Sequence, residues 1–490
     1  MKSIERENVP VAKPFVYRQP ELLIGGRPAS GGGRKSQPVV NPATFEVLGE
    51  LPHATPGDLD DCLAAAQRGF VLWREVSPQE RGRILKRAAD ILRTQAGELA
   101  YTVALEVGKP MQQGGWEAAT AADTLEWFAE EGRRAYGRVL PGRYGGARFT
   151  VVKEPVGPVA GFAAWNFPLI NASRKIGAAL GAGCSCIYKP AEEAPSSGMA
   201  VARALMAAGL PQDALSVVFG VPAEVSAHLL ASPVIRKLSF TGSVPVGRQL
   251  TQLAAQRSIR TTMELGGHGP VIVCADADVE QTAALAVATK YKNAGQVCVS
   301  PTRFLVHESV YARFTQAFVA GARALRLGPG TDPASDMGPM IHQRRRDAVH
   351  ALVADACAQG ATLACGGQAV DGAGWFYAPT VLTDVPAAAR ILHEEPFGPV
   401  ALIARFTQIE QALAVANDTG YGLAAYAFSR DAHTLSLLAS RLEAGMVALN
   451  SFVVSQPDAP FLGVKDSGHG AEAGSEGLEA CLVTKLITQT

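Results

Sequence analysis

The sequence has 490 residues, more than one ordinary hydrophobic core accommodates, and 48% are apolar, so we expect two large domains. Its 45 lysines and arginines balance 45 aspartates and glutamates, which argues against nucleic-acid and anionic-membrane partners because both favour a basic excess. The charged start, MKSIERENVP, lacks the apolar core of a signal peptide, and no apolar run is long enough to span a bilayer. We therefore expect a cytoplasmic protein. Eight cysteines form neither a CxxC pair nor a zinc pattern, so no metal site is predicted.

Helices and strands follow one another in blocks along the chain. Apolar residues at three- and four-residue spacing predict helices between residues 56 and 131, and strands joined by glycine turns follow over 133–157. Residues 156–256 then alternate buried strands with helices, which predicts a parallel sheet covered by helices on both faces. A second alternating block begins near residue 266, and the chain ends on a strand-like tail, LEACLVTKLITQT. This pattern favours an α/β fold with two parallel-sheet domains.

Three short segments lie directly after predicted strands: Trp165–Asn166, Lys189–Glu192 and Gly242–Ser243. In parallel α/β sheets, ligands bind beyond the carboxyl ends of the strands, so these segments are candidate binding residues. The lysine and glutamate of the second segment suit the hydroxyls of a ribose, with a surface ion pair as the alternative. The sequence has no GxGxxG fingerprint. In FTGSVPVG, residues 240–247, glycines open a helix whose N-terminus suits a phosphate, which is a weak signal by itself.

The strongest local signal is YKNAGQVCVSPTR, residues 291–303. Cys298 is flanked there by small, flexible residues at the end of a predicted helix and is followed by Ser-Pro, a poor position for core packing. These surroundings favour an accessible nucleophilic thiol whose backbone N–H also faces a developing oxyanion. The alternative is a buried structural cysteine.

Two further motifs carry polar side chains suited to acyl chemistry. In MELGGHGP, residues 263–270, Glu264 stands at the junction of the two α/β blocks, where a carboxylate facing a cleft suits a general base. A structural ion pair is the alternative. In AAWNFP, residues 163–168, the amide of Asn166 at a strand end suits donation to an oxyanion, with a purely turn-forming role as the alternative.

The motifs WNFP, KPAE, FTGS, ELGG, NxGQxC and EEPFGP occur in the order and rough spacing of the aldehyde dehydrogenase superfamily. The resemblance covers essentially the whole chain, from the NPAT turn to PFLGVKDSG near the end. It implies two Rossmann-like parallel-sheet domains and a small β arm that pairs with another subunit, as in a homodimer or homotetramer. The implied cofactor-binding domain comprises residues 1–131 and 151–264, the catalytic domain 265–469, and the oligomerisation arm 132–150 and 470–490.

The resemblance also implies roles for individual residues. Cys298 is expected to be the nucleophile that forms a thioester, Glu264 the base that activates the deacylating water, and Asn166 an oxyanion donor together with the Cys298 backbone N–H. The expected cofactor is NAD, with NADP possible. Its adenosine ribose is assigned to Lys189 and Glu192, its pyrophosphate and adenine surroundings to Trp165, Gly242, Ser243 and Val246, and its nicotinamide ribose and ring to Glu395 and Phe397.

Within the superfamily, the chain most resembles the succinate-semialdehyde dehydrogenases, through RKLSFTGSVPVGRQL and WNFPLINASRK. Arg174 stands where general aldehyde dehydrogenases usually carry an aromatic residue, and a guanidinium suits the distal carboxylate of such a substrate. The alternative is an ion pair with a neighbouring acid. Lys292 stands where that subfamily often has a second arginine, and Ser455 matches a carboxylate-binding serine in a loop that otherwise diverges. Ser300 replaces a second cysteine of some relatives, which excludes a disulfide switch there.

The expected reaction is therefore the NAD-dependent oxidation of an acid semialdehyde, such as succinate semialdehyde, to the carboxylate. Glutarate semialdehyde and a keto-acid semialdehyde are open alternatives. So are a broad-specificity aliphatic or aromatic aldehyde dehydrogenase and a relative that acylates coenzyme A. Relatives of the last kind often lack the ELGG glutamate, so the presence of Glu264 favours hydrolysis.

Overall fold

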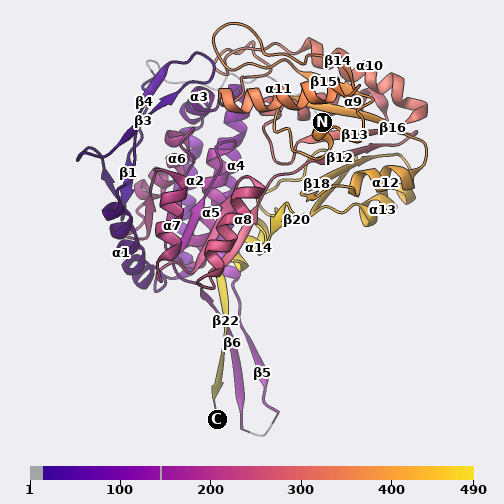
Figure 1. Cartoon of the computed structure of the whole chain (residues 1–490). Coiled ribbons are helices and arrows are strands. Elements are labelled where there is room, and N and C mark those ends of the chain that lie inside the picture. The colour runs from indigo at the N-terminus through magenta and orange to yellow at the C-terminus, as the bar shows by residue number, and fades with distance from the viewer. Residues whose placement is uncertain (1–14, 144–145, 490) are drawn as a thin grey trace.

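The computed structural model describes residues 15–143 and 146–489. Two α/β bodies lie side by side, and a three-stranded arm projects away from them (Figure 1). The charged segment at the start of the sequence lies outside the described residues, so the expectation drawn from it is not addressed by the fold. The two-body α/β architecture expected from the sequence is confirmed.

An eight-stranded sheet forms the centre of the first body, in the order β2-β1-β9-β8-β7-β10-β11-β21. Strands β9, β8, β7, β10 and β11 are parallel neighbours, whereas β1, β2 and β21 join the two edges antiparallel. The parallel sheet predicted from residues 156–256 is therefore present. The strands are β1 Leu22–Ile24, β2 Arg27–Ala29, β7 Val159–Phe162, β8 Cys186–Lys189, β9 Leu215–Val217, β10 Lys237–Thr241, β11 Arg260–Glu264 and β21 Gly468–His469.

The helices that connect these strands each have a proline in their first turn. Proline suits this position because its fixed φ is helical and the backbone N–H that it lacks would have no partner within the helix. The crossover helices are α5 Pro168–Ala182, α6 Pro195–Ala207, α7 Pro222–Ala231 and α8 Val244–Ala255.

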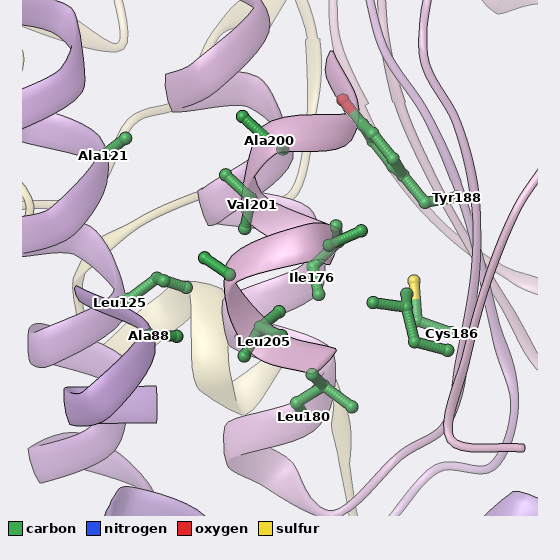
Figure 2. Close-up of a cluster of buried hydrophobic side chains, with 14 of the residues drawn as sticks. Ala88, Ala121, Leu125, Ile176, Leu180, Cys186, Tyr188, Ala200, Val201 and Leu205 are labelled. Atoms are coloured by element: carbon green, nitrogen blue, oxygen red, sulfur yellow. The ribbon is translucent and has the colours of Figure 1, made fainter. Parts of the chain in front are cut away.

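Four further helices come from the N-terminal half, as the periodicity predicted: α1 Pro56–Trp73, α2 Pro78–Thr94, α3 Ala96–Glu106 and α4 Met111–Glu131. Helix α1 begins with a capping box, in which the Thr55 side chain and the Asp58 backbone and side chain bond reciprocally. Figure 2 shows side chains of α2, α4, α5, α6 and β8 meeting in one apolar cluster. Small side chains such as Ala88 and Ala121, both fully buried, let the helices approach one another closely.

A seven-stranded sheet forms the second body, in the order β14-β15-β16-β13-β12-β18-β19, with only β14 antiparallel to its neighbour. Its strands are β12 Gly269–Val273, β13 Pro301–His307, β14 Thr362–Cys365, β15 Thr380–Thr383, β16 Val400–Phe406, β18 Ala424–Phe428 and β19 Met446–Leu449. Its helices are α9 Val279–Lys290, α10 Glu308–Ala324, α11 Gln343–Ala358, α12 Ile409–Asn417 and α13 Ala432–Arg441. Two small strand pairs, β3 Ser36–Val40 with β4 Val47–Pro52 and β17 Tyr421–Gly422 with β20 Val464–Lys465, complete the sheets of the two bodies.

The arm consists of β5 Arg138–Pro141, β6 Arg148–Pro155 and β22 Leu482–Gln489, all antiparallel (Figure 1). These limits differ from the predicted arm, residues 132–150 and 470–490. Residues 144–145 and 490 of the predicted arm lie outside the described part of the chain. Strand β6 continues to Pro155 because all eight of its residues pair with β22. Residues 470–481 do not belong to the arm, since α14 Gly474–Glu479 packs its buried Leu478 against the core of the first body.

Among the described residues, 15–143 and 146–489, no helix is long and apolar enough to cross a membrane. No group of three or more histidine, cysteine, aspartate or glutamate side chains among them is placed to hold a metal ion. All eight cysteines are unpaired.

Candidate active site

The carboxyl ends of the first sheet bring four predicted site residues to one edge. Strands β8, β7, β10 and β11 are parallel neighbours, so the segments that follow them begin at the same edge. Asn166 follows β7, Lys189 ends β8, Gly242 follows β10 and Glu264 ends β11. The antiparallel strand β21 pairs with the end of β11, which returns the C-terminal part of the chain to this edge.

Cys298 lies on the cysteine loop, the segment between α9 and β13. Three consecutive residues of this loop are left-handed, Asn293 at φ 49°, Ala294 at φ 52° and Gly295 at φ 70°. At Gly295 a Cβ atom would lie 2.1 Å from the Gly398 carbonyl oxygen, so both the backbone conformation and the close approach require glycine. The Asn-Ala-Gly sequence thus turns the chain sharply just before the thiol.

Hydrogen bonds within the loop and to other segments of the second body hold the cysteine loop in place. The Gln296 amide donates to the Asn293 carbonyl oxygen at 3.1 Å and accepts from the Ile341 N–H at 2.9 Å. The Tyr426 hydroxyl donates to the Val299 carbonyl oxygen at 2.6 Å. The backbone on both sides of the thiol is therefore anchored to the body that carries it.

Glu264 is a buried carboxylate next to this thiol. The residue is 3% exposed, and its Oε1 has no hydrogen-bond partner among the described residues. Burial and the charge of Glu472 raise the pKa of Glu264 to about 8, while the charges of Arg174 and Lys175 and contact with the Cys298 thiol lower it. A free oxygen on a carboxylate that titrates near neutrality suits a base that accepts a proton from water.

The Cys298 side chain is partly exposed but is packed among acidic groups. Burial, followed by the charges of Glu264 and Glu395, raises the pKa of the Cys298 thiol well above its usual value. The Arg174 guanidinium acts in the opposite direction. The thiol is therefore protonated at neutral pH in this state, so nucleophilic attack requires that its proton be transferred.

A buried network beside Glu264 was not predicted from the sequence. The Lys175 ammonium donates to Glu472 and, at 2.6 Å, to the Thr241 hydroxyl, and the Ser239 hydroxyl donates to Glu472 at 3.1 Å. Although burial raises it, the charges of Lys175 and Arg174 hold the pKa of Glu472 below its usual value. The one sequence signal for this network is a second cation, Lys175, directly after Arg174 on a helix with no other charged residue.

The Asn166 side chain faces the cysteine loop. Its amide nitrogen donates to the Gln296 carbonyl oxygen at 3.2 Å, two residues before the thiol. The backbone carbonyl oxygen of Asn166 accepts from the Lys109 ammonium at 2.7 Å and from the Asn293 side-chain amide at 3.3 Å. An amide has two hydrogens, so one remains for an oxygen atom formed near Cys298.

The predicted adenosine and pyrophosphate residues lie at the carboxyl ends of β8 and β10 and in the first turn of α8. The Lys189 ammonium contacts the Glu192 carboxylate at 2.6 Å, and this carboxylate also accepts from the Gly220 N–H at 3.4 Å. Ser243 stands at the N-cap of α8, but its side chain makes no capping bond. Val246 in the first turn of that helix is 43% exposed. An uncapped helix N-terminus beside an ion pair fits a phosphate and a ribose.

The predicted nicotinamide residues lie at the junction of the two bodies. Glu395 accepts from the Gly267 N–H at 3.1 Å, and burial raises the pKa of Glu395 to about 7. A Cβ atom at Gly266 would lie 2.3 Å from the Glu395 carboxylate, so glycine is needed for this approach. The Phe397 ring meets the Trp165 ring edge to face, with centroids 5.7 Å apart. One residue from each body thus forms an aromatic wall.

Arg174 and Ser455, both predicted to bind substrate, are in contact. The guanidinium donates to the Ser455 hydroxyl at 2.8 Å and stacks over the Phe461 ring at 4.1 Å. Arg174 is 7% exposed, yet among the described residues no carboxylate lies within 4.0 Å of it. The alternative of a direct ion pair with a neighbouring acid is therefore not what the structure contains.

Lys292, the third predicted substrate residue, has a different environment. Its ammonium lies 3.5 Å from the centroid of the Trp116 ring and 6.0 Å from that of Phe167. Burial and the charge of Lys109 lower the pKa of Lys292 to about 8, although the charge of Glu117 acts in the opposite direction. In the described part of the chain, the side chains of Lys292 and Arg174 contact different residues: Trp116 and Phe167 for Lys292, and Ser455 and Phe461 for Arg174.

The chain is similar to known proteins over almost its whole length. A model of the aldehyde dehydrogenase family matches residues 29–487. The chain is 48% identical over 472 residues to a 4-(hydroxymethyl)benzenesulfonate dehydrogenase, TsaD1, of Comamonas testosteroni, covering 96% of this chain and 98% of that protein. It is 38% identical over 472 residues, with the same coverage, to the NADP(+) succinate-semialdehyde dehydrogenase GabD of Escherichia coli (strain K12).

A solved structure has the same fold over nearly the whole chain. The crystal structure of succinate-semialdehyde dehydrogenase from Burkholderia pseudomallei matches with a TM-score of 0.95 and 40% identity, covering 97% of this chain and 98% of that one. Identity above 30% over almost the full length, together with the family match, is sufficient to assign the family. The chain therefore belongs to the aldehyde dehydrogenase family, enzymes that oxidise aldehydes with NAD or NADP.

Proposed function

We propose that this enzyme oxidises an aldehyde with a distal anionic group, with succinate semialdehyde the first compound to test. The observation that carries the proposal is Arg174, a buried guanidinium with no carboxylate within 4.0 Å among the described residues. A buried, unpaired cation is costly, so a substrate anion that pairs with it would bind strongly. Its effect on the pKa of both Cys298 and Glu264 indicates that the guanidinium is near the reacting groups.

The proposed chemistry uses three residues of the chain. The Cys298 thiol gives its proton to a water molecule, and its sulfur attacks the aldehyde carbon as the carbonyl π bond opens. The resulting oxyanion accepts from the free hydrogen of the Asn166 amide and from the Cys298 backbone N–H. A bound nicotinamide cofactor supplies the acceptor for the hydride that leaves this carbon. Glu264 then takes a proton from the water that hydrolyses the thioester and releases the carboxylate. Covalent capture makes the hydride transfer unimolecular and positioned.

We also propose that NAD is preferred over NADP. The residues fit a dinucleotide, because the uncapped start of α8 suits the pyrophosphate and the aromatic pair Trp165–Phe397 suits the nicotinamide end. Glu192 would accept hydrogen bonds from a ribose 2′-hydroxyl, whereas its charge opposes a 2′-phosphate. Lys189, at 2.6 Å from this carboxylate, reduces the repulsion, so a preference is expected and not strict exclusion.

Wild-type enzyme is expected to have a higher kcat/KM with NAD than with NADP, and Glu192→Ser is expected to reduce this ratio about tenfold, equivalent to 1.4 kcal/mol. The reason is the loss of the carboxylate that opposes the 2′-phosphate. Steady-state kinetics with each cofactor measures the ratio. Glu308→Ser, which removes an exposed carboxylate of the second body, is the control and should leave the ratio unchanged. A wild-type enzyme that is equally efficient with NADP would refute the assignment.

A second substrate class is an aromatic aldehyde with an anionic substituent. The relative with a benzenesulfonate in its name is 48% identical to this chain, above the 38% of the succinate-semialdehyde dehydrogenase GabD. In this chain Lys292 stacks on Trp116 and lies near Phe167, an arrangement of one cation and two aromatic rings that suits an anionic aromatic ring. Both classes share the distal anion, and the length and shape of the substrate distinguish them.

Arg174→Leu is expected to lower the preference for an acid aldehyde over hexanal by about 10- to 150-fold, because a charge-assisted pair contributes roughly 1.5–3 kcal/mol. The quantity to measure is the ratio of kcat/KM for succinate semialdehyde or 4-formylbenzenesulfonate to that for hexanal. A ratio is needed because Arg174 also lowers the pKa of Cys298 and Glu264, so its loss slows the reaction of every aldehyde at neutral pH.

Ser455→Ala provides the matched control, since it removes one hydrogen bond to the guanidinium and retains the charge. Its effect on the ratio should be smaller than that of Arg174→Leu. If the wild-type enzyme prefers hexanal or benzaldehyde, or if Arg174→Leu leaves the ratio unchanged, the distal-anion proposal fails while the family assignment stands. NADH formation without added coenzyme A separates hydrolysis from transfer to coenzyme A.

The three-stranded arm supports a homodimer or homotetramer as the working form. Four apolar side chains on its strands are exposed, Val139 at 55%, Leu140 at 38%, Leu486 at 59% and Ile487 at 44%. Exposed apolar side chains on a projecting sheet are typical of a surface that another subunit covers. Light scattering of the full chain measures the oligomeric state.

A further inference from the structure

A fully buried ion pair lies close to the candidate oxyanion donor. The Lys109 ammonium contacts the Glu117 carboxylate at 2.6 Å, and neither side chain has any solvent exposure. Lys109 precedes α4, and Glu117 lies on its second turn. Removing two charges from water is costly, and a buried pair is weak evidence for added stability, so its other contacts indicate what it does.

In the described part of the chain, the other side-chain hydrogen bonds of this pair are with one four-residue segment, residues 166–169. The Lys109 ammonium donates to the Asn166 carbonyl oxygen at 2.7 Å and lies 4.1 Å from the Phe167 ring centroid. The Glu117 carboxylate accepts from the Leu169 N–H at 2.9 Å, in the first turn of α5, where a backbone N–H has no partner within the helix. The pair therefore holds residues 166–169 at both ends.

On its other side, the same segment contacts the cysteine loop. The Asn166 amide donates to the Gln296 carbonyl oxygen at 3.2 Å. The Asn293 amide bridges the two segments, because it lies 3.3 Å from the Asn166 carbonyl oxygen and 3.2 Å from that of Gln296. Asn166 thus stands between the ion pair of the first body and the loop that carries Cys298.

We propose that Lys109 and Glu117 are positioning residues, which fix the backbone at Asn166 so that its amide is aimed at the oxyanion formed on Cys298. An oxyanion donor stabilises the transition state only when it is held at hydrogen-bond distance from the developing charge, and small displacements are costly. A buried, charged anchor resists such displacement better than a neutral contact. This role concerns the reaction of the family and does not depend on which aldehyde is the substrate.

A double-mutant cycle with Lys109→Met and Asn166→Ala tests the proposal in the full-length enzyme. Lys109→Met is expected to slow the first-turnover burst of NADH by about tenfold, a fraction of the roughly 100- to 1,000-fold lost with a whole oxyanion donor. In the Asn166→Ala background, the same change should slow the burst less than about twofold, because the residue through which Lys109 acts is gone. The KM of the Lys109→Met enzyme for NAD should change less than about twofold. An equal slowing in both backgrounds, or a wild-type burst in Lys109→Met, overturns the proposal.

Two further variants separate positioning from general stability. Arg34→Met breaks another ion pair, 2.7 Å from Asp58 at the start of α1, and should lower the Tm without slowing the burst. If Lys109→Met does not fold, Lys109→Met/Glu117→Leu removes both charges and leaves no unpaired buried ion. It should slow the burst in the wild-type background but not in the Asn166→Ala background. A wild-type burst in this double variant would also overturn the proposal.

The cycle is measured with both propanal and succinate semialdehyde, so that its outcome is independent of the substrate proposal. Preference of the wild-type enzyme for propanal would contradict the distal-anion proposal alone. If Lys109→Met slows the burst equally in the wild-type and Asn166→Ala backgrounds with both aldehydes, only the positioning role is contradicted.

Discussion

Cys298→Ser is expected to reduce aldehyde oxidation below about one per cent of wild type. Without the thiol no thioester forms, and a hundredfold loss corresponds to about 2.7 kcal/mol of transition-state stabilisation, well within the contribution of a nucleophile. The loop that presents the thiol has an unusual left-handed run and is anchored from the second body, so replacement of one sulfur by oxygen should not disturb it. Steady-state NADH production measures the loss.

Cofactor binding should survive this substitution, because the predicted cofactor contacts come from other strands. A thermal shift with NAD, of the same size as for the wild type, checks this. Cys357→Ser is the matched control, since Cys357 is also partly exposed but lies on α11. Turnover of Cys298→Ser above about one per cent would contradict the covalent mechanism.

Glu264→Gln is expected to release about one NADH per site in a rapid burst and then to stall. Hydride transfer needs no water, whereas hydrolysis of the thioester needs a base, and the unpartnered Oε1 of Glu264 is suited to that step. The substitution also removes a charge that raises the pKa of Cys298, so the first half-reaction should persist. Rapid-mixing absorbance at the NADH band resolves the two phases. Absence of both burst and turnover would instead assign Glu264 to activation of the thiol.

The pH dependence of the wild type provides an independent control for this role. Because the pKa of Glu264 is raised to about 8, the carboxylate is mainly protonated at pH 7 and becomes a base as the pH rises. A turnover limited by hydrolysis should therefore increase with pH through about 8 and then level off. In Arg174→Leu the rise should move to higher pH, since Arg174 lowers the pKa of Glu264. A flat profile in the wild type would argue against Glu264 as the base.

Much of the fold follows from local patterns in the sequence. Apolar periodicity predicted the helices between residues 56 and 131, and the strand–helix alternation predicted the parallel sheet of the first body. Prolines in the first turns of α5, α6 and α7 mark where each strand ends and its helix begins. The Asn-Ala-Gly turn before Cys298 is only partly local, because glycine permits the left-handed backbone at Gly295 whereas the close approach of Gly295 to Gly398 depends on packing. The spacing of apolar residues reflects which face of a helix or strand is buried, and a few consecutive residues are enough to show that spacing.

The contacts between distant segments followed only from the tertiary structure. The bond between Lys175 and Glu472 joins residues 297 positions apart, and the one between Lys109 and Asn166 joins residues 57 apart. The sequence predicted two substrate-binding cations, but only packing determined that Arg174 has no carboxylate within 4.0 Å among the described residues. The arm likewise ends where β6 stops pairing with β22, which depends on strand register. Periodicity specifies that a side chain is buried, whereas its partner is set by how the whole chain packs.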